Sequence, residues 1–152
     1  MAVHHVKLVG QVAGGREHIV AQADVGDPVL LIPERDNPFD PSAVAVYHAP
    51  RKALLNPAAL VSSVKDPAGV GQVDPTDRLL FLDRQAGYLP REFAATIDPP
   101  LPESGIVGVV DDVRYGPVEW AVGPDGEPEA LPPNVVGFDI LADLPAPERN
   151  SA

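Results

Sequence analysis

The side chains best suited to binding a ligand lie in one short stretch of the sequence, Glu34–Tyr47. Asn37 offers a hydrogen-bond donor and an acceptor, and Asp40 offers a carboxylate. Phe39 between them offers a ring for stacking, and Arg35 offers a guanidinium suited to a phosphate. These groups are typical of a binding site, because none of them forms a nucleophile–base pair.

The same stretch predicts how these groups are positioned. Its first half is rich in turn residues, and Pro38 and Pro41 fix the backbone, so no regular ladder can run through it. Residues 43–47 form a β-branched run that predicts a buried strand. A stiff turn that leads into a core strand holds polar groups in fixed directions. The simpler alternative is that Asn37 and Asp40 only cap their own turn.

A second stretch, residues 87–92, ends another predicted strand with the sequence Gly-Tyr-Leu-Pro-Arg-Glu. Tyr88 offers a second ring and Arg91 a second guanidinium. Pro90 favours a helix from about residue 90 to residue 97. A cation at the start of a helix faces the positive end of the helix dipole, so Arg91 should have an acid or a ligand nearby. A bridge to Glu92 or Asp36 is the simpler alternative.

Together the two stretches resemble the HIRAN domain, whose signature is an N-P-[YF]-D-x-x-A-[VI]-x-V strand followed later by G-[YH]-L-x-[RK]-E. Residues 37–46 and 87–92 match these motifs, and Val6–Gly10 fits the opening strand of the family. HIRAN domains occur as accessory modules of Swi/Snf-type DNA translocases and as free-standing bacterial proteins. The best-understood examples hold the 3′ end of single-stranded DNA in a narrow pocket.

The resemblance implies that Asp40 binds the terminal 3′ hydroxyl, with Asn37 beside it. A carboxylate suits a chain end, because it repels internal phosphates but accepts a strong hydrogen bond from a hydroxyl. Phe39 stands where tyrosine is commoner, and stacking alone is worth about 1–3 kcal/mol per base. The alternatives are that Phe39 plugs the core and that Tyr88 is an ordinary strand aromatic. The candidate DNA-binding residues are Asn37, Phe39, Asp40, Tyr88, Arg91, Arg35 and Arg16.

The charge of the chain argues against a wide nucleic-acid surface. The 152 residues carry 11 Lys and Arg against 22 Asp and Glu, a net charge of −11 with His neutral. Residues 81–152 alone carry 4 basic and 13 acidic groups, which gives −9. Because Lys and Arg supply non-specific DNA affinity, any DNA contact must be local. The alternatives are that the acidity serves solubility, or that a module without DNA binding docks a basic partner such as a helicase or nuclease.

The rest of the sequence predicts one small, mainly β domain over residues 1–144 and a flexible tail over residues 145–152. We expect a small OB-like β-barrel of about six or seven strands with one or two short helices, which is also the fold that the resemblance implies. The expected strands are 7–12, 28–32, 43–47, 79–88, 106–113, 118–122 and 135–141, with a turn at 123–126 between the last two. We expect residues 49–78 to be an insertion, with a helix that begins at Asn56-Pro57 and turns at 66–69 and 74–75. The insertion is either a surface excursion or a flap beside the site.

No motif in the sequence points to catalysis. It contains no G-x-S-x-G, P-loop or G-x-G-x-x-G pattern and no cysteine. The four histidines lack metal-ligand spacing, and His4 and His5 should point to opposite faces of a strand. We therefore expect a binding protein that is not an enzyme and has no metal or cofactor. No apolar run approaches the roughly 20 residues of a membrane helix, so we expect a cytoplasmic protein without a membrane partner.

Overall fold

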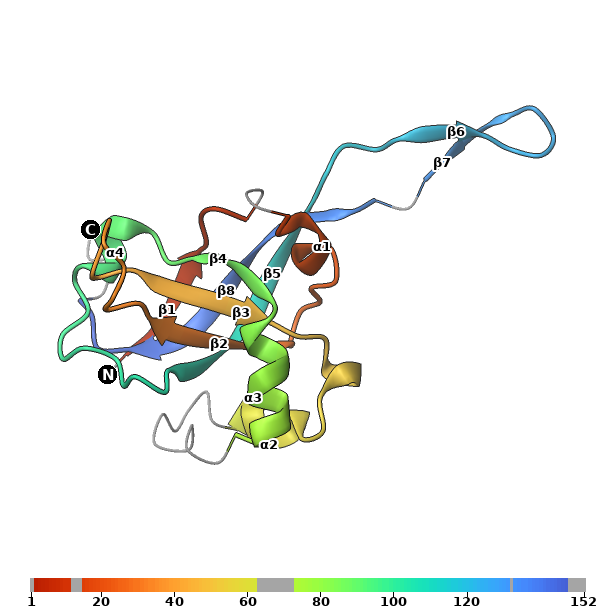
Figure 1. Cartoon of the computed structure of the whole chain (residues 1–152). Helices are drawn as coiled ribbons and strands as arrows, with labels where there is room; N and C mark the ends of the chain where they lie inside the picture. Colours follow the sequence, from red (N-terminus) through yellow and green to blue (C-terminus); the bar gives the residue numbers. More distant parts are fainter. Residues whose placement is uncertain (1, 12–14, 63–72, 132, 148–152) are drawn as a thin grey trace.

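The computed structural model describes residues 2–11, 15–62, 73–131 and 133–147 (Figure 1). Its strands are β1 (Ala2–Lys7), β2 (Pro28–Pro33), β3 (Val44–His48), β4 (Gln85–Tyr88), β5 (Ile106–Tyr115), β6 (Trp120–Val122), β7 (Pro128–Ala130) and β8 (Val135–Leu144). Its helices are α1 (Glu17–Val20), α2 (Pro57–Ser62), α3 (Pro75–Leu82) and α4 (Arg91–Ala94), with a 3₁₀ turn at Arg51–Ala53.

Six of the strands form one antiparallel sheet in the order β1-β8-β5-β2-β3-β4. The chain continues beyond β1 to Val9, which exchanges two backbone hydrogen bonds of 2.9 Å with Tyr88 of β4. The two edges of the sheet therefore meet at this bridge, and the sheet curls into a half-barrel. The prediction of a small, mainly β, OB-like fold is confirmed.

The core lies inside the curled sheet. Every strand of the sheet contributes to it, because side chains that alternate along a strand point to one face. Val6, Leu31, Val46 and Ile140 are all fully buried there. The helices α2 and α3 contact β2, β5 and β3 and add their own buried side chains to the same cluster. This core holds the motif strands β3 and β4 rigidly side by side.

Helix α3 stands where we expected a turn and then a strand. Asp74 caps it by accepting a hydrogen bond from the Thr76 N–H at 2.8 Å, and Pro75 fits the first turn, where its missing N–H costs nothing. The apolar run 79–82 is therefore helical, and within it Phe81 is buried. The predicted strand at 79–88 is therefore wrong for residues 79–82 and right for β4 at its end, because a short apolar run does not by itself distinguish a helix from a strand.

The parts of the insertion that the structure describes, residues 49–62 and 73–78, pack on the sheet through α2 and α3, at the end away from α4 (Figure 1). Leu54 and Leu60 belong to the core, so the expectation of a surface excursion was wrong for these residues. The buried Asp77 carboxylate accepts hydrogen bonds from the N–H groups of Leu55 and Asn56, at 2.7 and 3.0 Å. The turn expected at 66–69 lies outside the described residues.

The strands β6 and β7 form a second sheet that projects away from the half-barrel (Figure 1). They continue the β5–β8 pair, and the turn at 123–126 joins them, with Gly126 at a φ of 82°. We expected that turn between β6 and the strand that is now β8, so the prediction missed β7. Its sequence, Pro-Glu-Ala, contains no β-branched or aromatic residue that favours a strand. We call residues 116–131 and 133–134 the arm.

Three smaller boundaries also differ from the prediction. The first strand lies at Ala2–Lys7 and shares only Lys7 with the expected strand at 7–12, and α4 ends at Ala94 rather than Ile97. The expected tail begins with ordered contacts, because the carbonyl oxygen of Ala146 accepts a hydrogen bond of 3.1 Å from His4 Nε2. Residues 148–152 lie outside the part of the chain that the structure describes.

Candidate functional site

Asn37 shapes the motif turn. Its side-chain oxygen accepts hydrogen bonds from the N–H groups of Phe39 and Asp40, at 2.9 and 3.1 Å. Its amide nitrogen donates to Glu34 Oε1 at 3.1 Å. These are the contacts that the simpler alternative expected, and they give Asn37 the role of positioning its neighbours. The turn leads directly into β3.

Asp40 and Arg91 come together from the two motifs. Asp40 Oδ1 accepts a hydrogen bond from the Ser42 N–H at 3.0 Å, while Oδ2 lies 3.8 Å from Arg91 Nε. The Leu89 N–H donates to the Val44 carbonyl oxygen at 3.1 Å, which places the start of α4 beside the turn. The Arg91 side chain is 76% exposed and that of Asp40 22% exposed, so both remain accessible to a ligand. The acid that the described contacts show beside Arg91 is Asp40, whereas we had considered Glu92 or Asp36.

Phe39 extends into solvent. It is 89% exposed, more than any other large apolar side chain among the described residues. The alternative that it plugs the core is therefore wrong. A ring held outside the fold, on the residue that precedes Asp40, is free to stack on a ligand.

Tyr88 and Arg16 form a second group next to the first. The guanidinium carbon of Arg16 lies 5.2 Å from the centre of the Tyr88 ring, within cation–π distance. Arg16 Nη1 also donates to the carbonyl oxygen of Gly10 at 2.8 Å, which holds it over the ring. Gly87 allows β4 to lie close to the backbone of Val9, because a Cβ at residue 87 would lie 2.6 Å from the Val9 carbonyl oxygen.

Tyr47 belongs to this second group, and the sequence reasoning missed it. Burial raises the pKa of the Tyr47 phenol, Glu34 and Tyr88 raise it further, and Arg16 lowers it. Glu34 is also the partner of Asn37, so it lies between the two groups. Strand alternation in the sequence places Tyr47 on the same face as Ala45, but the pairing of Ala45 with Tyr88 depends on the register of the folded sheet, so the sequence alone could not join the two tyrosines.

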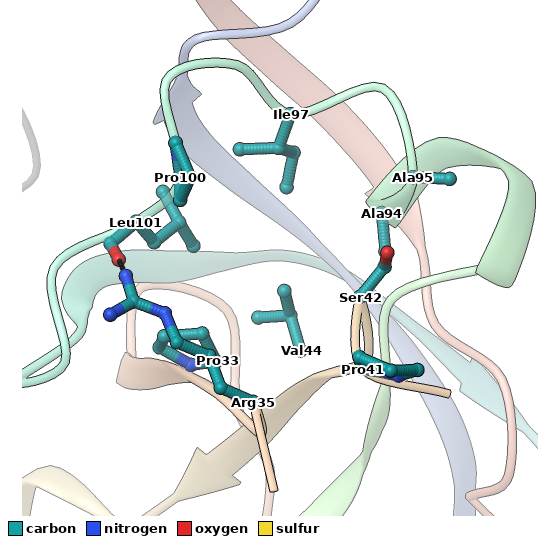
Figure 2. Close-up of a pocket in the computed structure, with 10 residues that line it drawn as sticks. All are labelled: Pro33, Arg35, Pro41, Ser42, Val44, Ala94, Ala95, Ile97, Pro100 and Leu101. Atoms are coloured by element: carbon teal, nitrogen blue, oxygen red, sulfur yellow. Dashed lines mark hydrogen bonds between the residues drawn. The ribbon is translucent and has the colours of Figure 1, made fainter. Parts of the chain in front are cut away.

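A cavity of about 290 Å³ separates the motif turn from the segment that follows α4 (Figure 2). Arg35 lies on one wall, where its Nη2 donates to the Leu101 carbonyl oxygen at 2.6 Å and its Nη1 lies 3.3 Å from Glu103 Oε1. These contacts hold Arg35 at the wall of the cavity, and none of its described contacts is to Asp40 or Arg91. The cavity is lined by Pro33, Arg35, Pro41, Ser42, Val44, Ala94, Ala95, Ile97, Pro100 and Leu101.

The histidines lie elsewhere in the fold. His4 is buried, whereas His5 is exposed and its Nε2 lies 3.2 Å from Asp111 and 3.3 Å from Asp139, so the two point to opposite faces as expected. Among the described residues, no three His, Asp or Glu side chains gather closely enough to hold a metal ion. In the same part of the chain, no helix is long and apolar enough to cross a membrane.

The comparisons with known proteins leave the family of this chain open. No family model, curated protein or solved structure matches it. The resemblance to the HIRAN domain therefore stays a prediction that depends on the two motifs.

Proposed function

We propose that this chain is a HIRAN-like binding module that holds the 3′ end of single-stranded DNA, as an accessory step in DNA repair or processing. The observation that carries the proposal is the approach of Arg91 Nε to Asp40 Oδ2 at 3.8 Å, in a turn whose preceding residue, Phe39, has an exposed ring. An acceptor, a cation and a stacking surface are the three groups that a terminal nucleotide needs.

Each group has a distinct role in this proposal. Asp40 Oδ2 accepts the hydrogen bond of the 3′ hydroxyl and repels a phosphate in its place. Arg91 binds the phosphate on the 5′ side of the terminal sugar, and Phe39 stacks on the base. Asn37 acts through the turn, since its side-chain oxygen already holds the N–H groups of Phe39 and Asp40. Arg16 and Tyr88 extend the surface along the strand.

The Asp40–Arg91 pair does not obstruct a ligand. An exposed ion pair is worth about 0–1 kcal/mol, so a nucleotide can replace it at small cost. In the free protein, Arg91 also relieves the charge of Asp40 in a chain that is otherwise strongly acidic. We expect binding to be confined to a few nucleotides, because residues 81–152 repel a longer strand.

The test is fluorescence anisotropy at low salt with short oligonucleotides labelled at the 5′ end. One oligonucleotide carries a free 3′ hydroxyl and the other a 3′ phosphate. We expect the first to bind and the second to bind at least about tenfold more weakly, since a charge-assisted hydrogen bond is replaced by repulsion. Asp40→Ala should abolish this preference, and Arg91→Ala should weaken binding of both.

The matched control variants each remove one carboxylate or one guanidinium at a position away from the Asp40–Arg91 pair. Asp36→Ala removes an exposed carboxylate from the same turn, and Arg78→Ala removes a guanidinium that is bonded to the Ser104 carbonyl oxygen. Both should leave the 3′ preference intact. A preference that survives Asp40→Ala removes Asp40 from the site, and a folded protein that binds neither oligonucleotide refutes the proposal.

A second function of another class is favoured by the net charge of −11. In that function the module binds a basic protein, such as a helicase or nuclease, and does not bind DNA. Association should then weaken steeply with salt and should be insensitive to Asp40→Ala. The same set of variants, titrated with DNA and with a candidate protein, separates the two functions.

A further inference from the structure

The arm has one apolar face and one acidic face. In its ladder Trp120 pairs with Ala130, and Val122 pairs with Pro128, so these four side chains share a face. Glu129 pairs with Ala121 on the opposite face. This division is that of a half-buried sheet, in which one face is covered and the other meets solvent.

Nothing among the described residues covers the apolar face. Trp120 is 65% exposed and Val122 is 79% exposed, and every residue of β6 and β7 is exposed. The arm extends beyond β5 and β8 with no other element alongside it (Figure 1). An isolated two-stranded hairpin gains little from its own packing, and tryptophan is the side chain most enriched where proteins bind one another.

The charge of the arm identifies what can cover it. The sequence from 116 to 134 carries four acidic residues and no lysine or arginine. Glu129 and Glu119 lie on the side of the strands opposite Trp120, and Asp125 and Glu127 lie in the turn between the two strands. They repel nucleic-acid phosphates and anionic lipid, and a second copy of this chain, at a net charge of −11, would be repelled as well. A basic protein surface is attracted.

We propose that the arm is a docking element for a partner protein that presents an apolar pocket bordered by Lys or Arg. Trp120 and Val122 enter the pocket, and the carboxylates of the arm pair with the basic rim. This interaction is separate from DNA binding, because the arm contributes none of the residues around Asp40 and Arg91. A single module can therefore hold a DNA end and a protein at the same time.

The test uses a short labelled peptide that alternates valine and lysine, which presents an apolar and a basic face when extended. The whole protein is added stepwise to the peptide, and the fluorescence anisotropy of the peptide is measured. The emission of Trp120, the one tryptophan of the chain, is followed in parallel. We expect binding, a shift of the tryptophan emission to shorter wavelength, and weaker binding at high salt. A peptide that alternates valine and glutamate should not bind.

Variants of the arm test the two faces separately. Trp120→Ala should weaken peptide binding about tenfold or more, as the loss of an interface tryptophan does. Val122→Ser should weaken it, whereas Val3→Ser, the same change at an exposed position of β1, should not. Glu119→Gln should reduce the salt dependence more than Asp83→Asn, which removes one exposed acid from the body.

A further variant removes the arm altogether. Tyr115 lies opposite Val135 in the β5–β8 ladder, so Asn-Gly can replace residues 116–134 as a tight hairpin turn. This variant should lose peptide binding while its binding of the 3′ hydroxyl oligonucleotide is unchanged. Failure of the DNA proposal would leave the peptide result intact, and the reverse also holds.

Several outcomes would overturn the proposal. They are a folded protein that does not bind the lysine peptide, equal binding of the lysine and glutamate peptides, and binding that survives Trp120→Ala. Sedimentation that shows a dimer lost in Trp120→Ala would assign the face to a second copy. A tryptophan shift with an oligonucleotide or with anionic vesicles, but not with the peptide, would assign it to those ligands.

Discussion

The Asp27 carboxylate is the buried polar group whose loss should destabilise this fold most. Its side chain is 3% exposed and lies between the start of β2 and the end of β3. It accepts hydrogen bonds from His48 Nε2 at 2.8 Å, from Arg51 Nε at 3.1 Å and from the Asp24 N–H at 3.0 Å. The His48 ring is fully buried, and its Nδ1 has no partner among the described residues, so Asp27 provides the polar contact of that ring there.

The change Asp27→Ala removes all three contacts. We expect a cost of about 3–5 kcal/mol, because each buried donor that is left without an acceptor costs about 1–3 kcal/mol and three donors lose the same acceptor. That is a large share of a typical stability of about 5–15 kcal/mol. For a chain of this size it corresponds to a fall in melting temperature of roughly 6–20 °C. Asp27→Asn keeps an oxygen that can accept from His48, so its cost should be smaller.

The assay is urea unfolding followed by circular dichroism, with the slope compared between variants to confirm two-state behaviour. Asp24→Ala is the matched control, since that carboxylate makes an exposed hydrogen bond to the Val25 N–H and its loss should cost about 1 kcal/mol or less. An Asp27→Ala variant that loses no more than Asp24→Ala would refute the reasoning.

Two further predictions concern the strands beneath the site. Gly87→Ala should destabilise the fold by about 1–3 kcal/mol, since the new methyl group would meet the Val9 carbonyl oxygen; amide exchange at Val9 and Tyr88 should accelerate, and unchanged exchange would contradict this. Burial raises the pKa of Tyr47 above 10.0, so the folded state retains this proton longer than the unfolded state. Stability should therefore be unaffected below about pH 10 and fall as the pH rises further. The free energy of unfolding, measured with urea, should therefore fall less from neutral to alkaline pH in the Tyr47→Phe variant than in the wild type. An equal fall in the two proteins would exclude Tyr47 as the cause.

The sequence predicted the parts of the fold that depend on local pattern. β2 and β3 follow directly from apolar runs bounded by turn residues, and β5 follows from the run at 106–113. The sequence did not predict β7 or α3, and the reason is local as well. Pro-Glu-Ala has low strand propensity, and the apolar run at 79–82 has no clear helical or strand period. The closure between Val9 and Tyr88 is a long-range contact that no window of sequence contains.

The candidate site shows the same division. The motifs selected Asp40 and Arg91, which the structure brings within 3.8 Å. The sequence could not show that Arg35 turns to the Leu101 carbonyl, or that Arg16 lies over Tyr88, because these contacts join residues 66 and 72 positions apart. Nor could it pair His48 with Asp27 across 21 positions. Such pairs depend on strand register, which only the folded sheet defines.

The place of β1 in the sheet has a consequence for how the chain folds as it is made. β1 pairs along its length with β8, so the ladder that joins Ala2 to Leu144 can form only after Leu144 has been synthesised. Contacts between such distant residues carry a large loop-closure cost and slow the folding of small domains. During synthesis, the strands β2 and β3 can pair while β1 remains an open edge. Completion of the half-barrel is therefore delayed until the last strand has left the ribosome.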